Sequence, residues 1–162
     1  MKPLDKRQLF TFGPILPEHW LCPCCDAGDI NLDLLNDVWE LWRQIGSHWK
    51  ITSAFRCEKH NKAVGGMPNS YHLTGMAVDI QPILHTPAQL AVMAYATPHW
   101  AHHGLLLYPA RGIIHYDLRP QPAALVDTPT GWLPLWPWIR ERYPHLPTPN
   151  YPHQHPTPPG DP

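Results

Sequence analysis

Two histidines and one aspartate stand out in this sequence as residues that could bind a metal ion: His72, Asp79 and His115. One carboxylate and two imidazoles make up the mixed oxygen and nitrogen set that suits zinc with a fourth position left open for water. Structural zinc sites are usually closed by four protein ligands, whereas catalytic sites keep a position free. The three residues therefore predict a catalytic zinc centre.

Asp117 follows His115 at a spacing of two on a predicted strand. Residues two apart share a face of a strand, so His115 and Asp117 project to one side, while Ile114, Tyr116 and Leu118 face the core. Two roles remain open for Asp117. It could be the general base that takes a proton from zinc-bound water, or it could orient the ligand histidine.

Two arginines are candidates for substrate binding, Arg56 and Arg119. A planar guanidinium matches a carboxylate or a polarised carbonyl with two hydrogen bonds. The alternative is that either side chain forms an ordinary ion pair within the protein.

The elements that would position these residues follow from the hydrophobic pattern. Residues 31–46 predict an amphipathic helix with Asn31 as N-cap and Gly46 as its end, and its tryptophans are assigned to packing. A second helix is expected over 87–96 with Thr86 as its N-cap. A short helix is expected over 58–64, and a closing helix begins at Trp136. Strands are expected over 9–12, 49–55, 76–80, 104–108 and 112–118, the last two as an antiparallel hairpin, with a loop over 65–69.

Length and composition indicate one domain. A chain of 162 residues with 43% hydrophobic residues and eight tryptophans can bury one core. We predict that the domain spans residues 1–143. Residues 144–162 are rich in proline and histidine and predict a disordered or extended tail. His153 and His155 in this tail could bind a metal only weakly, because nothing preorganises them.

The charge pattern excludes some partners. A formal net charge of −1 gives no reason to expect nucleic acid or an anionic membrane. The N-terminus has no apolar run typical of a signal peptide, and no stretch approaches the roughly 20 apolar residues of a membrane span. We expect a protein made in the cytoplasm without export by the general secretory route, acting as a monomer.

The cysteines form an unusual group, Cys22, Cys24 and Cys25 with Cys57 further along. This spacing lacks the paired arms common in zinc sites, so unmodified thiols are the favoured interpretation. A disulfide between Cys57 and one of the other three is the main alternative, and the pairing stays open.

Four blocks of this sequence together resemble the zinc D-Ala-D-Ala carboxypeptidase family, which includes peptidoglycan peptidases and phage endolysins and shares its fold with the hedgehog signalling domain. The blocks are residues 53–66, the element Ser70-x-His72-x-x-Gly75-x-Ala77-x-Asp79, residues 104–109, and His115-x-Asp117-x-Arg119. The resemblance covers about residues 8–120.

This resemblance implies an α+β fold with a small, mostly antiparallel sheet and flanking helices. It also implies one zinc ion bound by His72, Asp79 and His115, with Arg56 and Ser70 contacting the substrate. The implied reaction is hydrolysis of a peptide bond in peptidoglycan stem peptides, with zinc polarising the carbonyl and supplying the hydroxide.

The sequence departs from the family pattern at Gly112, where several members carry a catalytic Glu or Asp. Glycine cannot do acid-base work, so either Asp117 serves or the protein is a zinc-binding relative with little activity. His102 and His103 are also unusual here. One of them could approach the metal, with surface or packing histidines as the favoured alternative.

Three functions follow as hypotheses. The first is a zinc D-Ala-D-Ala carboxypeptidase, and the second is an endopeptidase that cleaves cross-links. The third is a non-catalytic zinc-bearing module of a phage structure or of cell-wall recognition. The absence of a signal peptide favours a phage or prophage origin, with the bacterial cell wall as the site of action.

Overall fold

The computed structural model describes residues 15–149 of the chain. Its helices are η1 (Pro17–Trp20), α1 (Leu32–Ile45), α2 (Glu58–Ala63), η2 (Tyr71–Thr74), α3 (Pro87–Tyr95), η3 (Trp100–His102), η4 (Pro109–Arg111) and α4 (Leu135–Arg142), where η marks a 3-10 helix. Its strands are β1 (Trp49–Ser53), β2 (Ala77–Pro82), β3 (Gly104–Tyr108), β4 (Ile113–Asp117), β5 (Ala123–Thr128) and β6 (Gly131–Pro134).

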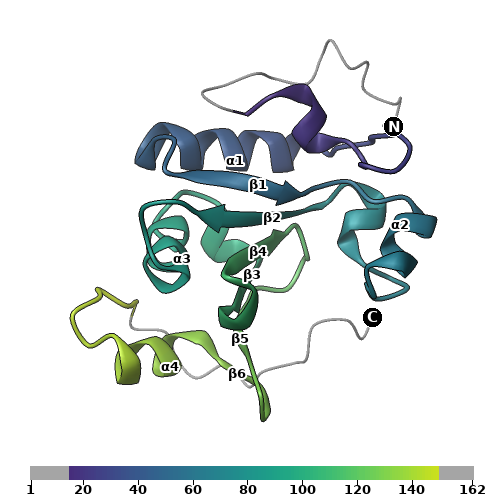
Figure 1. Ribbon diagram of the computed structural model, residues 1–162. Coiled ribbons are helices and arrows are strands. Elements are labelled where there is room, and N and C mark those ends of the chain that lie inside the picture. The colour runs from purple at the N-terminus through teal and green to yellow at the C-terminus, as the bar shows by residue number, and fades with distance from the viewer. Residues whose placement is uncertain (1–14, 150–162) are drawn as a thin grey trace.

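The strands form one sheet of six, in the order β1-β2-β4-β3-β5-β6. Every neighbouring pair is antiparallel except β3 and β5, which run parallel. The predicted α+β class with a mostly antiparallel sheet is therefore confirmed. The pairing of β2 with β4 joins segments that are distant in the sequence (Figure 1).

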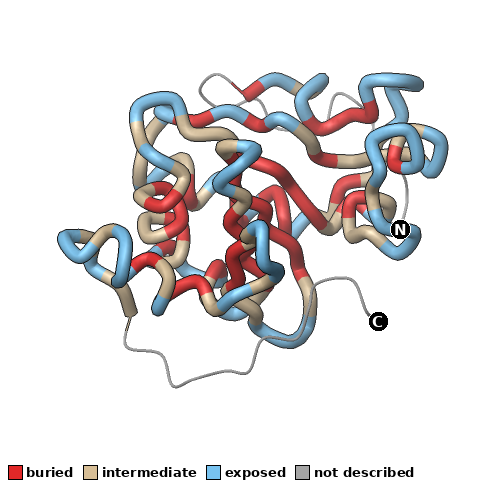
Figure 2. The backbone as a smooth tube through the Cα atoms, turned by 60° about the horizontal axis from the view of Figure 1, so that its bottom comes forward, coloured by how far each residue is buried: buried red, intermediate tan, exposed pale blue. Residues whose placement is uncertain are grey.

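Helices α1 and α3 cover one face of the sheet. Buried aromatic residues connect α1 to strand β4. Trp100 stacks on Tyr116 of β4 with ring centroids 4.0 Å apart. The hydroxyl of Tyr116 donates to Oδ2 of Asp37 in α1 at 2.6 Å, and the indole N–H of Trp100 donates to the carbonyl of Asp37 at 3.0 Å. Buried residues are concentrated in the strands and the inner sides of the helices, as Figure 2 shows.

Local signals in the sequence placed most elements correctly. Asn31 caps α1 by accepting a hydrogen bond from the amide of Asp33 at 2.8 Å, and Gly46 ends the helix. Thr86 and Gln89 cap the start of α3 reciprocally. The hairpin of β3 and β4 turns through η4 and closes at Gly112, whose φ of 68° lies in the left-handed region that glycine adopts without steric cost.

Strands β5 and β6 were not predicted. Strand β6 has only four residues. Strand β5 is held by its parallel pairing with β3 and by contacts with α4, so no local pattern marks it. Helix α4 begins at Leu135, one residue before the predicted start.

The start of the predicted tail lies against the domain. Leu146 packs on the core, and Arg140 of α4 donates to the Thr148 hydroxyl and the Pro149 carbonyl. The domain boundary at residue 143 stays a prediction. The expected strand over 9–12 and the histidines His153 and His155 lie outside the described residues.

Candidate active site

The register between β2 and β4 places Asp79 directly opposite His115. Their side chains meet on the sheet face turned away from α1, with Oδ1 of Asp79 2.8 Å from Nδ1 of His115. The third residue, His72, comes from η2 and brings its Nε2 to 3.2 Å from the same oxygen. One ligand atom from each of the three residues lies within 4.8 Å of the other two.

Each histidine is oriented by a hydrogen bond from its other ring nitrogen. Nδ1 of His72 lies 2.6 Å from the carbonyl of Ala54, so this nitrogen carries the proton and Nε2 keeps its lone pair. Nε2 of His115 lies 2.9 Å from Oδ2 of Asp117, which leaves Nδ1 directed at Asp79. Two imidazole nitrogens and a carboxylate therefore face one point. The nitrogens offer lone pairs once a metal replaces any proton they share with Asp79, and the three groups form a donor set that fits zinc.

Arg56 is paired with the carboxylate of Asp79. Its Nη2 donates to Oδ2 of Asp79 at 2.5 Å, and its Nε donates to the hydroxyl of Ser53 at 2.7 Å. The oxygen of Asp79 used by Arg56 is the one that does not face the histidines. The arginine therefore fixes the orientation of the carboxylate and leaves Oδ1 available.

Asp117 is fully buried, and both of its oxygens are occupied. Oδ2 contacts His115 and accepts from Nη2 of Arg119 at 2.5 Å, while Oδ1 accepts from Nε of Arg119 at 2.7 Å. Gly104, opposite Asp117 in the β3–β4 pair, makes room for this ion pair. A Cβ at Gly104 would lie 2.4 Å from both Nε of Arg119 and Oδ1 of Asp117.

The charges of this cluster are set by burial and by its hydrogen bonds. Burial alone would raise the pKa values of the two aspartates. In the zinc-free protein, the contacts with His115 and His72 lower the pKa of Asp79, and the contacts with Arg119 and His115 lower that of Asp117, so both lie well below the usual range. Burial lowers the pKa of His72. For His115, hydrogen bonds to Asp117 and Asp79 outweigh burial and raise its pKa to about 9. Both carboxylates are thus anionic at neutral pH.

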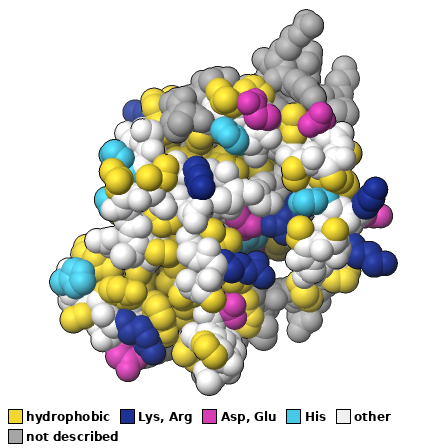
Figure 3. All heavy atoms as spheres, in the orientation of Figure 1, with side chains coloured by type: hydrophobic (Ala, Val, Ile, Leu, Met, Phe, Trp, Pro, Cys, Tyr) yellow, Lys and Arg dark blue, Asp and Glu magenta, His cyan; other side chains and the backbone are white. Residues whose placement is uncertain are grey.

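The cluster lies in the wall of a cleft of about 730 Å³. Figure 3 shows acidic, basic and histidine side chains side by side in a hollow of this face. Besides the residues already described, the cleft is lined by residues from the loop before η2, from η2, β3 and η4, from the connection between β4 and β5, and from the β5–β6 hairpin. They are Val64, Gly65, Gly66, Met67, Asn69, Ser70, Tyr71, Leu106, Tyr108, Arg111, Pro120, Gln121, Ala123, Asp127 and Trp132.

Most of the residues predicted from the sequence are brought together here. Ser70 lines the cleft and caps η2 by accepting from the amide of His72 at 3.3 Å. His103 does not join the cluster of possible metal ligands among the described residues. Instead, its Nδ1 lies 3.0 Å from the carbonyl of Arg119, and its ring packs on Tyr116. The neighbouring His102 is exposed.

The cleft residues that were missed from the sequence include Tyr108, Arg111 and Trp132. The guanidinium of Arg111 lies 5.0 Å from the ring centroid of Tyr108, and the ring of Trp132 lies 5.4 Å from it. Burial raises the pKa of Tyr108 to about 12, so it stays protonated. Tyr108 ends the first strand of the predicted hairpin and Arg111 lies in its turn, which is the signal that could have found them, whereas Trp132 lies on the unpredicted strand β6.

One of three comparisons with known proteins gives a match. A sequence model of the family described as peptidase M15 matches residues 21–117, more than half of the chain. A search of curated proteins and a search of solved structures gave no match. Among the described residues, no helix is long and apolar enough to cross a membrane.

The matched range contains the three candidate ligands, Arg56 and Asp117. Membership implies a metallopeptidase that depends on zinc and acts on a substrate of the peptidoglycan type. The chain belongs to the peptidase M15 family of zinc D-Ala-D-Ala carboxypeptidase-like peptidases.

Proposed function

We propose that this protein hydrolyses a peptide bond in peptidoglycan stem peptides, using one zinc ion held by His72 Nε2, the Asp79 carboxylate and His115 Nδ1. The observation that carries the proposal is the convergence of these three ligand atoms, within 4.8 Å of one another, in the wall of a 730 Å³ cleft. Three protein ligands leave a fourth position for water or substrate.

Zinc bound there would polarise the scissile carbonyl and lower the pKa of a coordinated water to about 7. The protein's contribution is orientation. The Ala54 carbonyl and the Asp117 carboxylate hold the two histidines, and Arg56 holds the carboxylate of Asp79. With both of its oxygens taken, Asp117 is better placed to position His115 than to accept a proton from water.

The cleft suits a short peptide that carries a carboxylate. Arg56, Arg111 and Arg119 place guanidinium groups along its wall, two of them paired with the carboxylates of Asp79 and Asp117. The contacts of Arg56 described above use Nε and Nη2, which leaves Nη1 for a substrate oxygen. Tyr71, Tyr108 and Trp132 supply aromatic surface for the apolar parts of the peptide. We assign Arg56, Ser70 and Arg119 to substrate contact.

One observation favours a second candidate, a non-catalytic zinc-bearing module that recognises the cell wall or belongs to a phage structure. Gly112 lies in the hairpin turn and has no side chain, and the Asp117 carboxylate is fully engaged. A site without a free base would bind a stem peptide without cleaving it.

The test combines zinc analysis with hydrolysis of a defined set of muropeptides, read by mass spectrometry. The wild type is expected to cleave, to lose activity with a chelator, and to recover it with zinc. His72→Ala should lose both activity and this zinc, whereas His102→Ala, an exposed histidine outside the cleft, should match the wild type.

The masses of the products decide the bond. Loss of a terminal D-Ala identifies a carboxypeptidase, and conversion of cross-linked dimers to monomers identifies an endopeptidase. Turnover that survives complete removal of zinc would overturn the proposal. Binding of muropeptides without turnover would establish the recognition module instead.

A further inference from the structure

The four cysteines come together at a second place, away from the cleft. Cys22 and Cys24 lie in the loop after η1, and Cys57 is the N-cap of α2. The Sγ atoms of Cys22 and Cys24 are 3.5 Å apart, those of Cys22 and Cys57 are 3.6 Å apart, and those of Cys24 and Cys57 are 3.3 Å apart. Cys25 completes a group whose four sulfurs all lie within 4.8 Å of one another.

The structure keeps the thiols unmodified, as the sequence favoured, but it gathers all four at one place, which neither interpretation from the sequence predicted. All four cysteines are free thiols, and the sulfur separations exceed the roughly 2.05 Å of a disulfide bond. A single disulfide would also leave the close approach of a third sulfur unexplained. Four thiols without a shared role would be expected to lie apart, whereas here two separate chain segments bring them together.

The separations match a metal-thiolate tetrahedron. With zinc–sulfur bonds of about 2.3 Å, the edge of a tetrahedron is about 3.8 Å. Three of the observed distances, 3.3 to 3.6 Å, lie just below that edge. Tight turns in the loop bring its thiols to one side, since the amides of Cys25 and Asp26 both donate to the carbonyl of Cys22.

Backbone amides point at two of the sulfurs, as thiolate ligands require. The amide of Cys57 donates to Sγ of Cys22 at 3.5 Å, and the amide of His60 donates to Sγ of Cys57 at 3.4 Å. The His60 bond is the main reason that the pKa of Cys57 falls to about 7, whereas hydrogen bonding to Cys57 raises the pKa of Cys24 to about 12. A bound cation would be needed to deprotonate all four thiols together.

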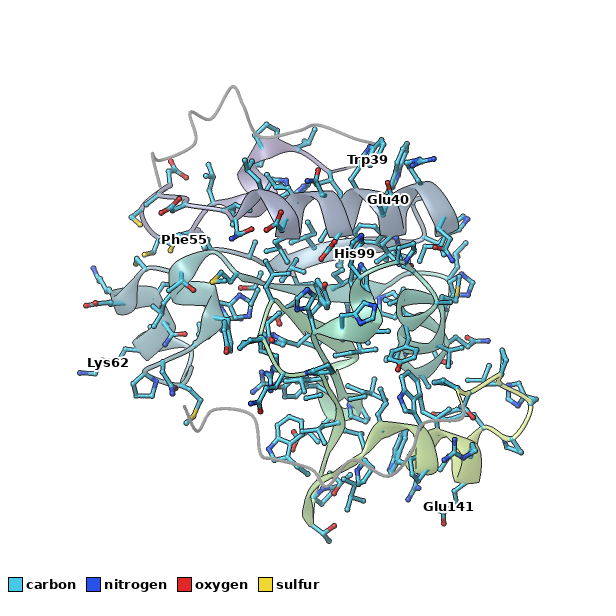
Figure 4. All side chains as sticks on the ribbon, turned by 180° about the vertical axis from the view of Figure 1, so that it is seen from behind. Trp39, Glu40, Phe55, Lys62, His99 and Glu141 are labelled. Atoms are coloured by element: carbon cyan, nitrogen blue, oxygen red, sulfur yellow. The ribbon has the colours of Figure 1, made fainter. Side chains whose placement is uncertain are left out.

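We propose that Cys22, Cys24, Cys25 and Cys57 bind a second zinc ion, in a closed structural site that is separate from the cleft. The site would join the loop of residues 22–26 to the start of α2. That junction is one residue from Arg56, whose amide donates to the His72 carbonyl at 3.0 Å and whose guanidinium holds Asp79. Phe55, labelled at the same end of the molecule in Figure 4, donates its amide to the carbonyl of Trp20. The second zinc would therefore stabilise the segment that carries Arg56.

Metal analysis of the full chain, purified with reductant and without added chelator, tests this proposal. We expect two zinc ions per chain in the wild type and one in Cys57→Ser. Ala27→Ser, which adds a hydroxyl to the same exposed loop without removing a thiol, should keep both. His72→Ala should keep one, and the double variant His72→Ala, Cys57→Ser should keep none.

Two further readouts keep the test decisive if Cys57→Ser fails to fold. His72→Ala refilled with cobalt(II) should show thiolate-to-metal charge-transfer absorption, because its remaining site has sulfur ligands. A chelator should lower its thermal unfolding midpoint, since a structural zinc contributes folding energy. Failure of the peptidase proposal would leave these results unchanged.

Either of two results would overturn the second site. One is a His72→Ala protein that folds and contains no zinc. The other is a mass for the unreduced wild type that shows disulfides among the four cysteines, with no zinc remaining in His72→Ala.

Discussion

His115 hydrogen-bonds Asp117 through Nε2 at 2.9 Å, and this contact turns Nδ1 of the same ring towards Asp79. The ring therefore has one nitrogen for the protein and one for a metal. If Asp117 positions the ring, Asp117→Asn should weaken zinc binding roughly 10- to 100-fold. Competition with a chromogenic chelator measures that affinity. Hydrolysis by Asp117→Asn should fall at limiting zinc and be partly restored at saturating zinc.

The same variant separates the two roles considered for Asp117. Wild-type zinc affinity with no hydrolysis at saturating zinc would identify Asp117 as the general base instead.

Arg56 holds the buried carboxylate of Asp79, so Arg56→Ala should destabilise the zinc-free protein. Loss of a hydrogen bond to a charged group costs about 2 kcal/mol, and urea unfolding of the chelated protein measures the difference. Arg43→Ala is the control. Arg43 pairs with Glu40 on the exposed side of α1, where removal of an ion pair costs at most about 1 kcal/mol. Equal losses in the two variants would contradict the assigned role of Arg56.

Gly104 leaves space for the Asp117–Arg119 pair. In Gly104→Ala the added Cβ would meet both side chains at 2.4 Å, so we expect about 1–3 kcal/mol of destabilisation together with weaker zinc binding. Gly112→Ala places its methyl group in open space at a φ of 68° and should cost about 1 kcal/mol from backbone conformation alone. Zinc affinity should stay unchanged in Gly112→Ala and fall in Gly104→Ala. Unchanged affinity in both would show that the pair does not act on His115.

Trp132 lines the cleft, and its ring packs against Tyr108. Trp132→Ala should raise KM about 2- to 10-fold, because an aromatic contact contributes roughly 0.5–1.5 kcal/mol, while zinc content stays the same. Trp39→Ala is the matched control, since Trp39 lies on the outer side of α1 with 40% of its surface exposed (Figure 4). A change in KM for Trp39→Ala, or none for Trp132→Ala, would place the substrate elsewhere.

Asp37 gives the stability of the core a pH dependence. Burial raises the pKa of its carboxyl, against the opposing effects of the Tyr116 hydroxyl and of His99 and His103. A raised pKa favours the protonated carboxyl in the folded state. Its contribution to stability is therefore complete below the unfolded pKa of about 3.9 and is lost as the pH rises through the folded pKa.

The measurement compares the wild type with Asp37→Asn, whose side chain does not ionise. The free energy of unfolding of Asp37→Asn, relative to the wild type, should rise between pH 4 and pH 7. A difference that is flat across this range would mean that the buried carboxyl has its ordinary pKa.

The amino-acid sequence by itself determined the elements whose signals are local. Apolar periodicity with Asn31 and Gly46 marked α1, Thr86 marked α3, and alternation marked the strands that carry Asp79 and His115. The candidate ligands and the family were also readable, because the spacing of these residue types along the chain is specific. These features depend on neighbours within a few residues, where propensity and capping act.

Only the tertiary structure decided which strands pair and which side chains become neighbours. The pairing of β2 with β4 sets Asp79 opposite His115, and the same arrangement occupies both oxygens of Asp117. Strands β5 and β6 bring Trp132 to the cleft without a local pattern of their own. The cysteine spacing argued against a metal site, yet folding joins Cys57 to a loop more than 30 residues earlier. Such contacts depend on strand register and on chain segments that meet only in the folded core, and a local pattern does not encode either.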